Sequence, residues 1–353
     1  MEIRNLQKLA AALLTLLAAG AVSARTSTGE FLQNGFGAKS AGLGNAYGVV
    51  VSDPSAVYWN PAGLAQIYTE KRITQTIEAP KSSEKPAGDD EEFNKLLEDQ
   101  NSSGTKESKT VEITERGYQA QLNASGAMLS NGRYMYFTAA GMTALGGGIA
   151  AGVGGTRIQS IATYDASGTS TGSTAFNAYS GYLGYGWGTG PVRLGISGFA
   201  VREDLIGGAV NGAGINVGAQ VVVLPPLLSV AADIKNLGAI QSRTGGGFKE
   251  LGKLDTLFSF SMQIQAPPPN SNFKLIIGFT ANLDKPEGDG VRLNMGVAYG
   301  FNKYMYAMLG LNGSKPALGF GVNVGKTLQM AVSANRDILG REFQYFGELN
   351  FAF

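Results

Sequence analysis

The sequence ends in F-Q-Y-F-G-E-L-N-F-A-F, residues 343–353. Apolar and aromatic side chains occupy nearly every second position, and the positions between them include Gln344, Glu348 and Asn350. A repeat of two residues places alternate side chains on opposite faces of a strand, whereas a helix repeats every 3.6 residues. The stretch therefore predicts a β-strand of roughly ten residues with one apolar face.

The same alternation continues upstream, separated by short turn signals such as Asn312-Gly313-Ser314. Counting back from Phe353 predicts about fourteen strands, the even number typical of bacterial single-chain barrels. The expected strands lie near residues 66–79, 111–129, 133–165, 174–187, 191–203, 208–224, 227–237, 255–266, 272–283, 290–300, 303–312, 315–324, 326–335 and 341–353. The tight turns expected to share one end lie at 130–132, 188–191, 224–226, 266–270, 300–303 and 325–326.

The pattern favours an all-β transmembrane barrel of antiparallel strands over a soluble β-sandwich. A sandwich has the same period, but its strands are usually shorter and its apolar face points inward. The pattern does not fix which side chains face inward, because a shift of one residue exchanges the two faces. This ambiguity applies to Phe258, Phe260, Phe320 and Phe346.

The start of the chain predicts export. Arg4 and Lys8 precede an apolar run from Leu9 to Ala19, and Val22-Ser23-Ala24 offers a cleavage site, so residues 1–24 read as a signal peptide. We expect an N-terminal plug, or hatch, over 25–65 and the barrel over 66–353. A polar loop about 80–110 contains Asp-Asp-Glu-Glu at 89–92 and reads as solvated rather than as a cation site.

Composition excludes several classes of function. The chain has no His and no Cys, which removes Ser-His hydrolysis, thiolate chemistry and the usual metal ligands. The net charge of +1 gives no basic surface for nucleic acid. The glycine-rich run from Gly42 has Tyr47 where a nucleotide-binding loop needs its third glycine. We therefore expect no enzyme, no cofactor and no metal site.

Residues 40–64 read S-A-G-L-G-N-A-Y-G-V-V-V-S-D-P-S-A-V-Y-W-N-P-A-G-L. Small residues allow close packing inside a barrel. Asp53-Pro54 and Asn60-Pro61 each require a turn, because the residue before proline avoids the helical region. A disordered tail would not carry Tyr58 and Trp59, so this segment is expected to fill the lumen.

This segment resembles the N-terminal hatch of the outer-membrane long-chain fatty acid transporters, the FadL family. PorV-like barrels share the stretch Trp59 to Ala62. The positions that match the pattern are Gly42, Gly44, Ala46, Asp53, Ser55, Ala56, Asn60, Pro61, Ala62 and Gly63. The resemblance implies a fourteen-stranded barrel in the outer membrane of a Gram-negative-type bacterium, closed by the hatch and passing hydrophobic molecules without energy input.

The resemblance and the strand pattern together give the candidate residues. For the gating hatch they are Gly42, Gly44, Asp53, Asn60, Pro61, Ala62 and Gly63. For ligand binding they are Tyr58, Trp59, Arg193, Lys274 and Arg292. The glycines between Gly146 and Gly155, inside the long strand expected at 133–165, read as a curved strand or as a kink that opens the wall.

Three functions follow as expectations. The first is passive uptake of long-chain fatty acids or other hydrophobic ligands. The second is a PorV-like scaffold or shuttle for protein secretion, and the third an adhesive role for the loop about 80–110. An apolar pocket behind the hatch would favour transport, and a hydrated polar interior the scaffold. Expected partners are outer-membrane lipid, lipopolysaccharide and the barrel-assembly machinery, which would bind the strand ending at Phe353.

Overall fold

The computed structural model describes residues 35–78, 108–129, 132–164, 167–205, 208–245, 248–267, 272–284, 290–336 and 343–353. The signal peptide and most of the loop about 80–110 lie outside the described residues. No helix within these ranges is long and apolar enough to cross a membrane.

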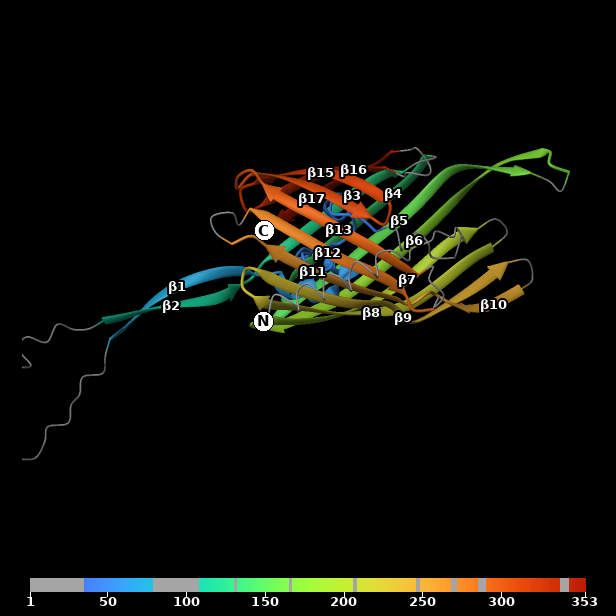
Figure 1. Ribbon diagram of the computed structural model, residues 1–353. Helices are drawn as coiled ribbons and strands as arrows, with labels where there is room; N and C mark the ends of the chain where they lie inside the picture. Colours follow the sequence, from blue (N-terminus) through green and yellow to red (C-terminus); the bar gives the residue numbers. More distant parts are fainter. Residues whose placement is uncertain are drawn as a thin grey trace, which may run out of the picture. The chain divides into compact units, whose positions relative to one another are not determined.

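The strands of the main sheet form a closed antiparallel barrel of fourteen strands in the described chain (Figure 1). Neighbours along the chain pair with each other, β8 pairs with β9, and β17 closes the ring against β3. The short strand β10 (Phe248–Lys253) pairs with β9 outside the ring. The barrel strands are β3 (Ala120–Leu129), β4 (Arg133–Ala144), β5 (Gly147–Tyr164), β6 (Ser170–Thr189), β7 (Val192–Leu205), β8 (Gly208–Leu224), β9 (Leu228–Gly245), β11 (Leu257–Gln265), β12 (Phe273–Asn282), β13 (Val291–Gly300), β14 (Met305–Asn312), β15 (Lys315–Val324), β16 (Leu328–Arg336) and β17 (Phe343–Ala352).

The expected number of strands is confirmed, but three of the expected strands, at 66–79, 111–129 and 133–165, are wrong. The strand expected at 111–129 is divided between β2 (Ser108–Gly117) and the barrel strand β3. The segment expected at 66–79 forms β1 (Thr69–Glu78), which pairs only with β2 (Ser108–Gly117) in a separate two-stranded sheet. Its sequence T-E-K-R-I-T-Q-T-I-E has charged residues on both alternating sets, so neither face suits lipid. The barrel strands begin at Ala120 rather than near residue 66.

The long strand expected at 133–165 is two strands, which restores the count. Leu145 and Gly146 form the turn between β4 and β5, with φ angles of 49° and 76°. Two consecutive positive φ values are typical of the two-residue hairpin turn that usually carries Asn-Gly. The glycines that follow are therefore part of β5 beside a turn. Because β4 ends at this turn, the connection between β3 and β4 lies at the opposite end of the barrel from the other tight turns.

The two ends of the barrel can be named from the chain. At one end the backbone amide of Phe353 donates to the carbonyl of Ala120 at 2.8 Å. We call this the C-terminal end; it also holds the turns after β4, β6, β8, β11, β13 and β15. We call the other end the loop end.

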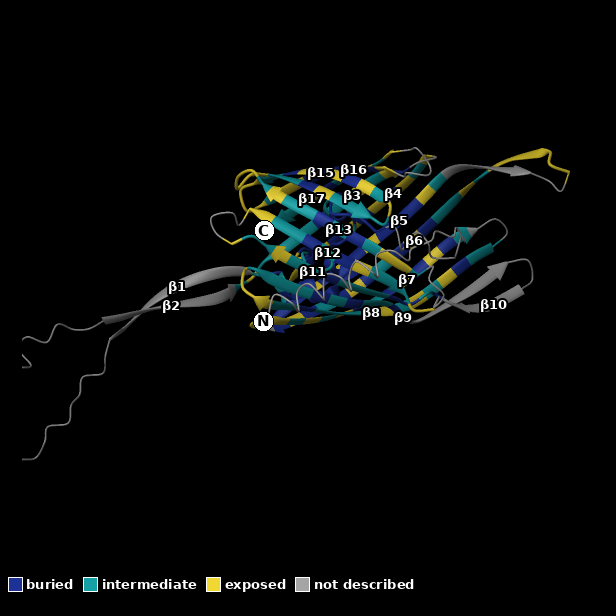
Figure 2. Ribbon diagram, viewed as in Figure 1, coloured by how far each residue is buried: buried dark blue, intermediate teal, exposed yellow. Residues whose placement is uncertain are grey.

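Buried and more exposed residues alternate along many of the barrel strands (Figure 2). On β17, Phe343 and Tyr345 are more than half exposed, whereas Phe346 and Glu348 are buried. Phe320 is exposed, and Phe258 and Phe260 stack on the exposed Phe279, so these three face outward. The outer surface is thus apolar, with aromatic side chains near both ends, as in transmembrane barrels.

The interior is filled by the residues that precede β1. They form α2 (Ala38–Gly42), α3 (Ala56–Trp59) and the 3₁₀ helix η2 (Pro61–Gln66). Helix α2 contacts β14 to β17, and η2 contacts β5 to β8 on the other side of the ring (Figure 1). We call residues 35–67 the plug.

Candidate functional site

The local sequence of the plug explains its turns. Asp53 Oδ1 accepts the backbone amide of Ser55 at 2.9 Å, which closes the turn at Pro54. Asn60 has extended backbone and its Oδ1 accepts the amide of Ala62 at 3.0 Å, so that it caps η2 while Pro61 occupies the first turn. Both bonds satisfy amides that the start of a helix or turn leaves free.

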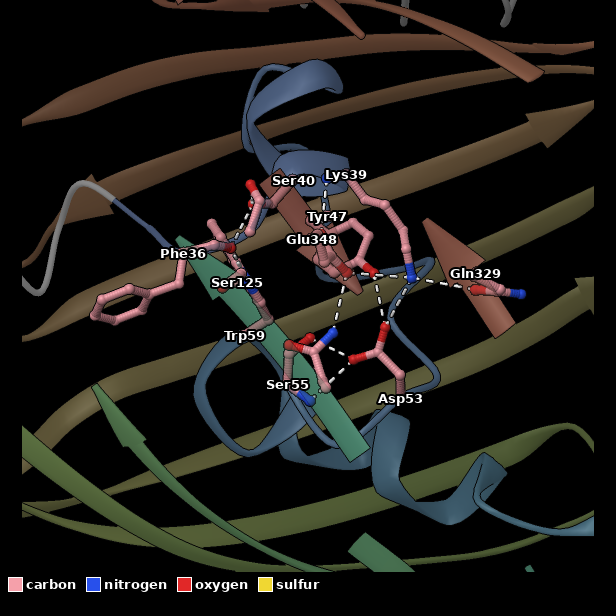
Figure 3. Close-up of polar contacts among 12 residues, drawn as sticks. Phe36, Lys39, Ser40, Tyr47, Asp53, Ser55, Trp59, Ser125, Gln329 and Glu348 are labelled. Atoms are coloured by element: carbon pink, nitrogen blue, oxygen red, sulfur yellow. Dashed lines mark hydrogen bonds and ion pairs between the residues drawn. The ribbon is translucent and has the colours of Figure 1, made fainter. Parts of the chain in front are cut away.

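Three buried charged groups join the plug to the wall of the barrel (Figure 3). Lys39 Nζ on α2 lies 3.2 Å from Asp53 Oδ2 and 3.2 Å from Glu348 Oε1 on β17. Glu348 also accepts the backbone amide of Lys39 at 2.9 Å and Nδ2 of Asn123 at 3.0 Å. We call Lys39, Asp53 and Glu348 the Lys39 cluster.

Lys39 and Asp53 of this cluster favour each other's charged form. Burial disfavours the ammonium of Lys39, but Glu348, Tyr47 and Asp53 outweigh burial and raise its pKa well above the usual value. Burial likewise disfavours a charged Asp53, but Lys39 and the hydrogen bonds from Ser55 prevail and lower its pKa. Lys39 and Asp53 are therefore a buried ion pair rather than two neutral groups, and Glu348 Oε1 lies within 3.2 Å of the same ammonium.

Glycines bring the plug into contact with the wall. Gly44, at φ 62°, lies against the backbone of Leu311 on β14, where an added Cβ would meet its amide. On the opposite side Gly195 of β7 lies against the backbone of Pro61 and Ala62. Gly186 of β6 is equally close: a Cβ there would lie 2.6 Å from the carbonyl oxygen of Pro61. Only glycine allows a strand and the plug backbone to approach this closely.

The plug and one side of the wall share an aromatic cluster. Phe36 stacks on Phe137 of β4 with ring centroids 5.0 Å apart, and Tyr58 meets Tyr182 of β6 at 5.8 Å. Tyr182 in turn contacts Phe199 of β7 at 6.0 Å. These five rings are buried, and we call them the aromatic face. Aromatic pairs of this kind add about 0.5–1.5 kcal/mol each beyond the area they bury.

A lysine of the wall completes this side. Lys235 Nζ of β9 lies 4.7 Å from the ring centroid of Tyr58 and 4.8 Å from that of Trp59. A cavity of about 10 Å³ lies beside it, lined by Tyr58, Tyr182, Asn216, Lys235, Asn236 and Leu257. That volume holds roughly one water molecule, so a hydrophobic ligand would need the plug to move before it could enter here.

The opposite side of the interior is polar. The wall from β13 to β3 presents buried Asn294, Ser333, Asn335, Glu348 and Asn350. Oxygens of four of these side chains, all but Glu348, have no hydrogen-bond partner among the described residues. The plug is thus held by the aromatic face and hydrogen bonds to β7 and β8 on one side, and by the Lys39 cluster on the other.

The residues predicted for the hatch gather in the plug. Gly42 contacts Met308 of β14, Asn60 donates to the carbonyl of Ala219 at 3.3 Å, and Gly63 lies against the backbone of Val51. Asp53 belongs to the Lys39 cluster, Gly44 meets the wall, and Pro61 and Ala62 are fully buried in η2. Their gating role stays a prediction.

The residues predicted for ligand binding do not form one site. Tyr58 and Trp59 lie together in the plug, with Trp59 Nε1 donating to the carbonyl of Phe36 at 3.0 Å. Lys274 and Arg292 share the inward faces of β12 and β13 but lie near opposite ends, because Lys274 pairs with Ala298 and Arg292 with Thr280. Arg193 is at the start of β7.

Sequence reasoning missed two lysines inside the barrel, Lys39 of the plug and Lys235 of the wall. Lys39 is the single charged residue between Glu30 and Asp53, which is a signal that it needs a buried partner. Lys235 stands two residues after Asp233 in β9, so strand alternation places both on the inward face. In the described part of the chain, no group of His, Cys, Asp and Glu could hold a metal ion.

Comparison with known proteins supports the fold. No protein-family model and no curated sequence matches this chain. Among solved structures it is similar to the P. putida toluene transporter TodX, with 12% identity, a TM-score of 0.51, and coverage of 90% of this chain and 97% of that one. It also matches the Ralstonia pickettii toluene transporter TbuX, with 11% identity, a TM-score of 0.48 and the same coverage. These structures are described as transporters rather than enzymes.

Proposed function

We propose that this chain is an outer-membrane barrel that admits hydrophobic molecules when its plug moves. The observation that carries the proposal is the aromatic face, in which Phe36 and Tyr58 of the plug cover the rings of the wall from inside. Displacing the plug would expose Phe137 on β4, Tyr182 on β6 and Phe199 on β7, whose rings contact one another across β5, and so line an apolar route along the wall. A hydrophobic solute would gain about 0.8 kcal/mol for each CH₂ that such a route buries.

The contacts of the plug suit a reversible opening. The Lys39 cluster can exchange its partners for water, and the glycine contacts involve no interlocked side chains. Within the aromatic face, the contacts of the plug rings with the wall rings can be replaced by contacts of the wall rings with the solute. Long-chain fatty acids or other hydrophobic compounds are the proposed solutes, and the movement is passive.

The proposed location follows from the surface. The outer wall carries large apolar side chains with aromatic residues toward both ends, which suits a bilayer. The chain ends of the barrel meet at Ala120 and Phe353, and both ends of bacterial barrels lie on the periplasmic side. We place the C-terminal end there, with the last strand ending at Phe353 as the contact for the barrel-assembly machinery.

A disulfide lock tests the proposal. The chain contains no cysteine, so an introduced pair can form only one intramolecular disulfide. A Cβ at Gly42 would lie 3.3 Å from Cβ of Met308, close to the separation that a disulfide needs. Gly42→Cys with Met308→Cys would join the plug to β14. The matched control is Thr138→Cys with Val153→Cys, directly opposed residues of β4 and β5 whose exposed side chains face away from the plug.

The assay is uptake of a fluorescent fatty acid and of a neutral hydrophobic dye into proteoliposomes. The oxidised lock should abolish uptake of at least one probe, reductant should restore it, and the control pair should take it up in both states. Uptake that continues in the oxidised lock contradicts the proposal. If the purified barrel passes neither probe and instead retains an exported protein, the secretion-scaffold alternative replaces it.

A further inference from the structure

The C-terminal end of the barrel differs in charge from the loop end. In the described residues its turns and strand ends carry four cations and no Asp or Glu side chain. The cations are Arg193, Lys274, Lys303 and Lys326. The loop end, in contrast, holds Glu203, Asp204, Asp255 and Asp284 beside its basic residues.

Two of these lysines belong to adjacent turns of the rim. Lys303 is in the turn between β13 and β14, and Lys326 is in the turn between β15 and β16. Asn323 links the turns, because its amide donates to the carbonyl of Tyr304 at 2.7 Å and its side chain to that of Lys303 at 3.4 Å. Both lysines are exposed to solvent in the described structure.

Exposed aromatic side chains lie in and beside the turn of Lys303. Lys303 Nζ lies 4.9 Å from the ring centroid of Tyr304, which is 50% exposed. Tyr299 and Phe301 contact each other at 5.4 Å and are also about half exposed. We call Tyr299, Phe301, Lys303, Tyr304 and Lys326 the rim patch. Aromatic rings at the level of lipid headgroups, with lysines reaching outward, are the usual arrangement at a membrane interface.

We propose that the rim patch binds the phosphate of an anionic phospholipid in the leaflet that the C-terminal end meets. This inference rests on the proposed membrane location. The two ammonium groups would contact the phosphate, and the acyl chains would lie along the exposed faces of Tyr299 and Phe301. The absence of Asp and Glu side chains leaves nothing on the neighbouring described turns to repel an anionic headgroup.

Native mass spectrometry tests this proposal. The protein in mild detergent is mixed with equal amounts of phosphatidylglycerol and phosphatidylcholine, and retained lipid is counted. The wild type should retain phosphatidylglycerol preferentially. Lys303→Gln with Lys326→Gln should weaken that binding about thirtyfold, because each lysine near an anionic lipid contributes about a factor of five to six. Lys315→Gln, at the loop end in the first residue of β15, is the matched control and should bind as the wild type does.

Three outcomes overturn the inference: equal retention of the two lipids, unchanged retention by the double variant, and displacement of phosphatidylglycerol by an equal concentration of inorganic phosphate. The last outcome would mean that the patch binds phosphate without recognising lipid. Heat-modified migration on gels confirms that each variant is a folded barrel. Uptake of hydrophobic probes is measured separately, so a failure of transport with lipid binding intact counts against the proposed function alone.

Discussion

Replacing Lys39 with methionine should release the plug. The substitution keeps the length and apolar stem of the side chain but removes its ammonium. Asp53 and Glu348 then remain as carboxylates whose side chains are only 5% and 3% exposed. Breaking a buried ion pair by removing one partner costs about 3–5 kcal/mol, because the remaining charge stays buried. The plug-docked state should therefore lose roughly a hundred- to several-thousand-fold in its equilibrium against the released state.

Protonation of Asp53 or Glu348 limits this loss of plug docking. Without Lys39, either carboxylate can take up a proton and so avoid the burial of a negative charge. The effect of Lys39→Met should accordingly be smaller at pH 5 than at pH 8. A triple variant that adds Asp53→Asn and Glu348→Gln leaves no charge in the cluster, and we expect it to recover most of the docking.

Hydrogen exchange measures the docking directly. The amide of Lys39 donates to Glu348, so its exchange reports whether the plug is seated on β17. In Lys39→Met the peptides covering 36–50 should exchange much faster, while those of β12 to β16 should not change. Lys326→Met, on the exposed rim, is the control. Wild-type protection of 36–50 in a correctly folded Lys39→Met barrel would refute the view that this cluster holds the plug.

Three further predictions concern the same interface. Gly186→Ala pushes a Cβ against the plug backbone and should weaken docking of the plug by about 1–3 kcal/mol, measured by hydrogen exchange. A Cβ at Gly181 on the same strand would meet nothing within 4 Å, so Gly181→Ala should be neutral. Lys235→Met removes two cation–π contacts, so the ring of Trp59 should become more accessible to an aqueous fluorescence quencher. An unchanged quenching constant would argue against those contacts. Because the pKa of Asp53 is lowered, its stabilisation of the plug is present above the unfolded value of 3.8 and is lost as pH falls through the folded value. Hydrogen exchange of the plug, corrected for the intrinsic rates, should therefore stay constant from about pH 5 to 8 and rise only in acid below roughly pH 4. A loss of protection near pH 6 would contradict this assignment.

The local sequence pattern was sufficient to predict much of the barrel wall. From β12 to β17 each strand has a period of two and a recognisable turn, so the sequence predicts the strands and their outward faces. The turn at Leu145-Gly146 escaped because leucine at a positive φ is not a turn signal, and the adjoining glycines extended the apparent strand. The first expected strand failed because β propensity alone does not distinguish a barrel strand from a separate hairpin.

The candidate site was predictable only in part. The small residues and the two proline turns of residues 40–64 predicted a compact segment, and the structure places that segment inside the barrel. The partners of its charges could not be found in the same way. Lys39 and Glu348 are 309 residues apart, and no local pattern relates an α-helical lysine to a glutamate in the last strand.

That separation has a consequence for the biogenesis of the protein. The plug is synthesised before every barrel strand, whereas Glu348 belongs to the final one, which pairs with β3. Lys39 therefore stays hydrated until the ring closes, and ordering of α2 should be among the last events of assembly. A chain that stalls before β17 lacks the carboxylate that seats its own N-terminus, so protease resistance of residues 36–50 would distinguish a finished barrel from an incomplete one.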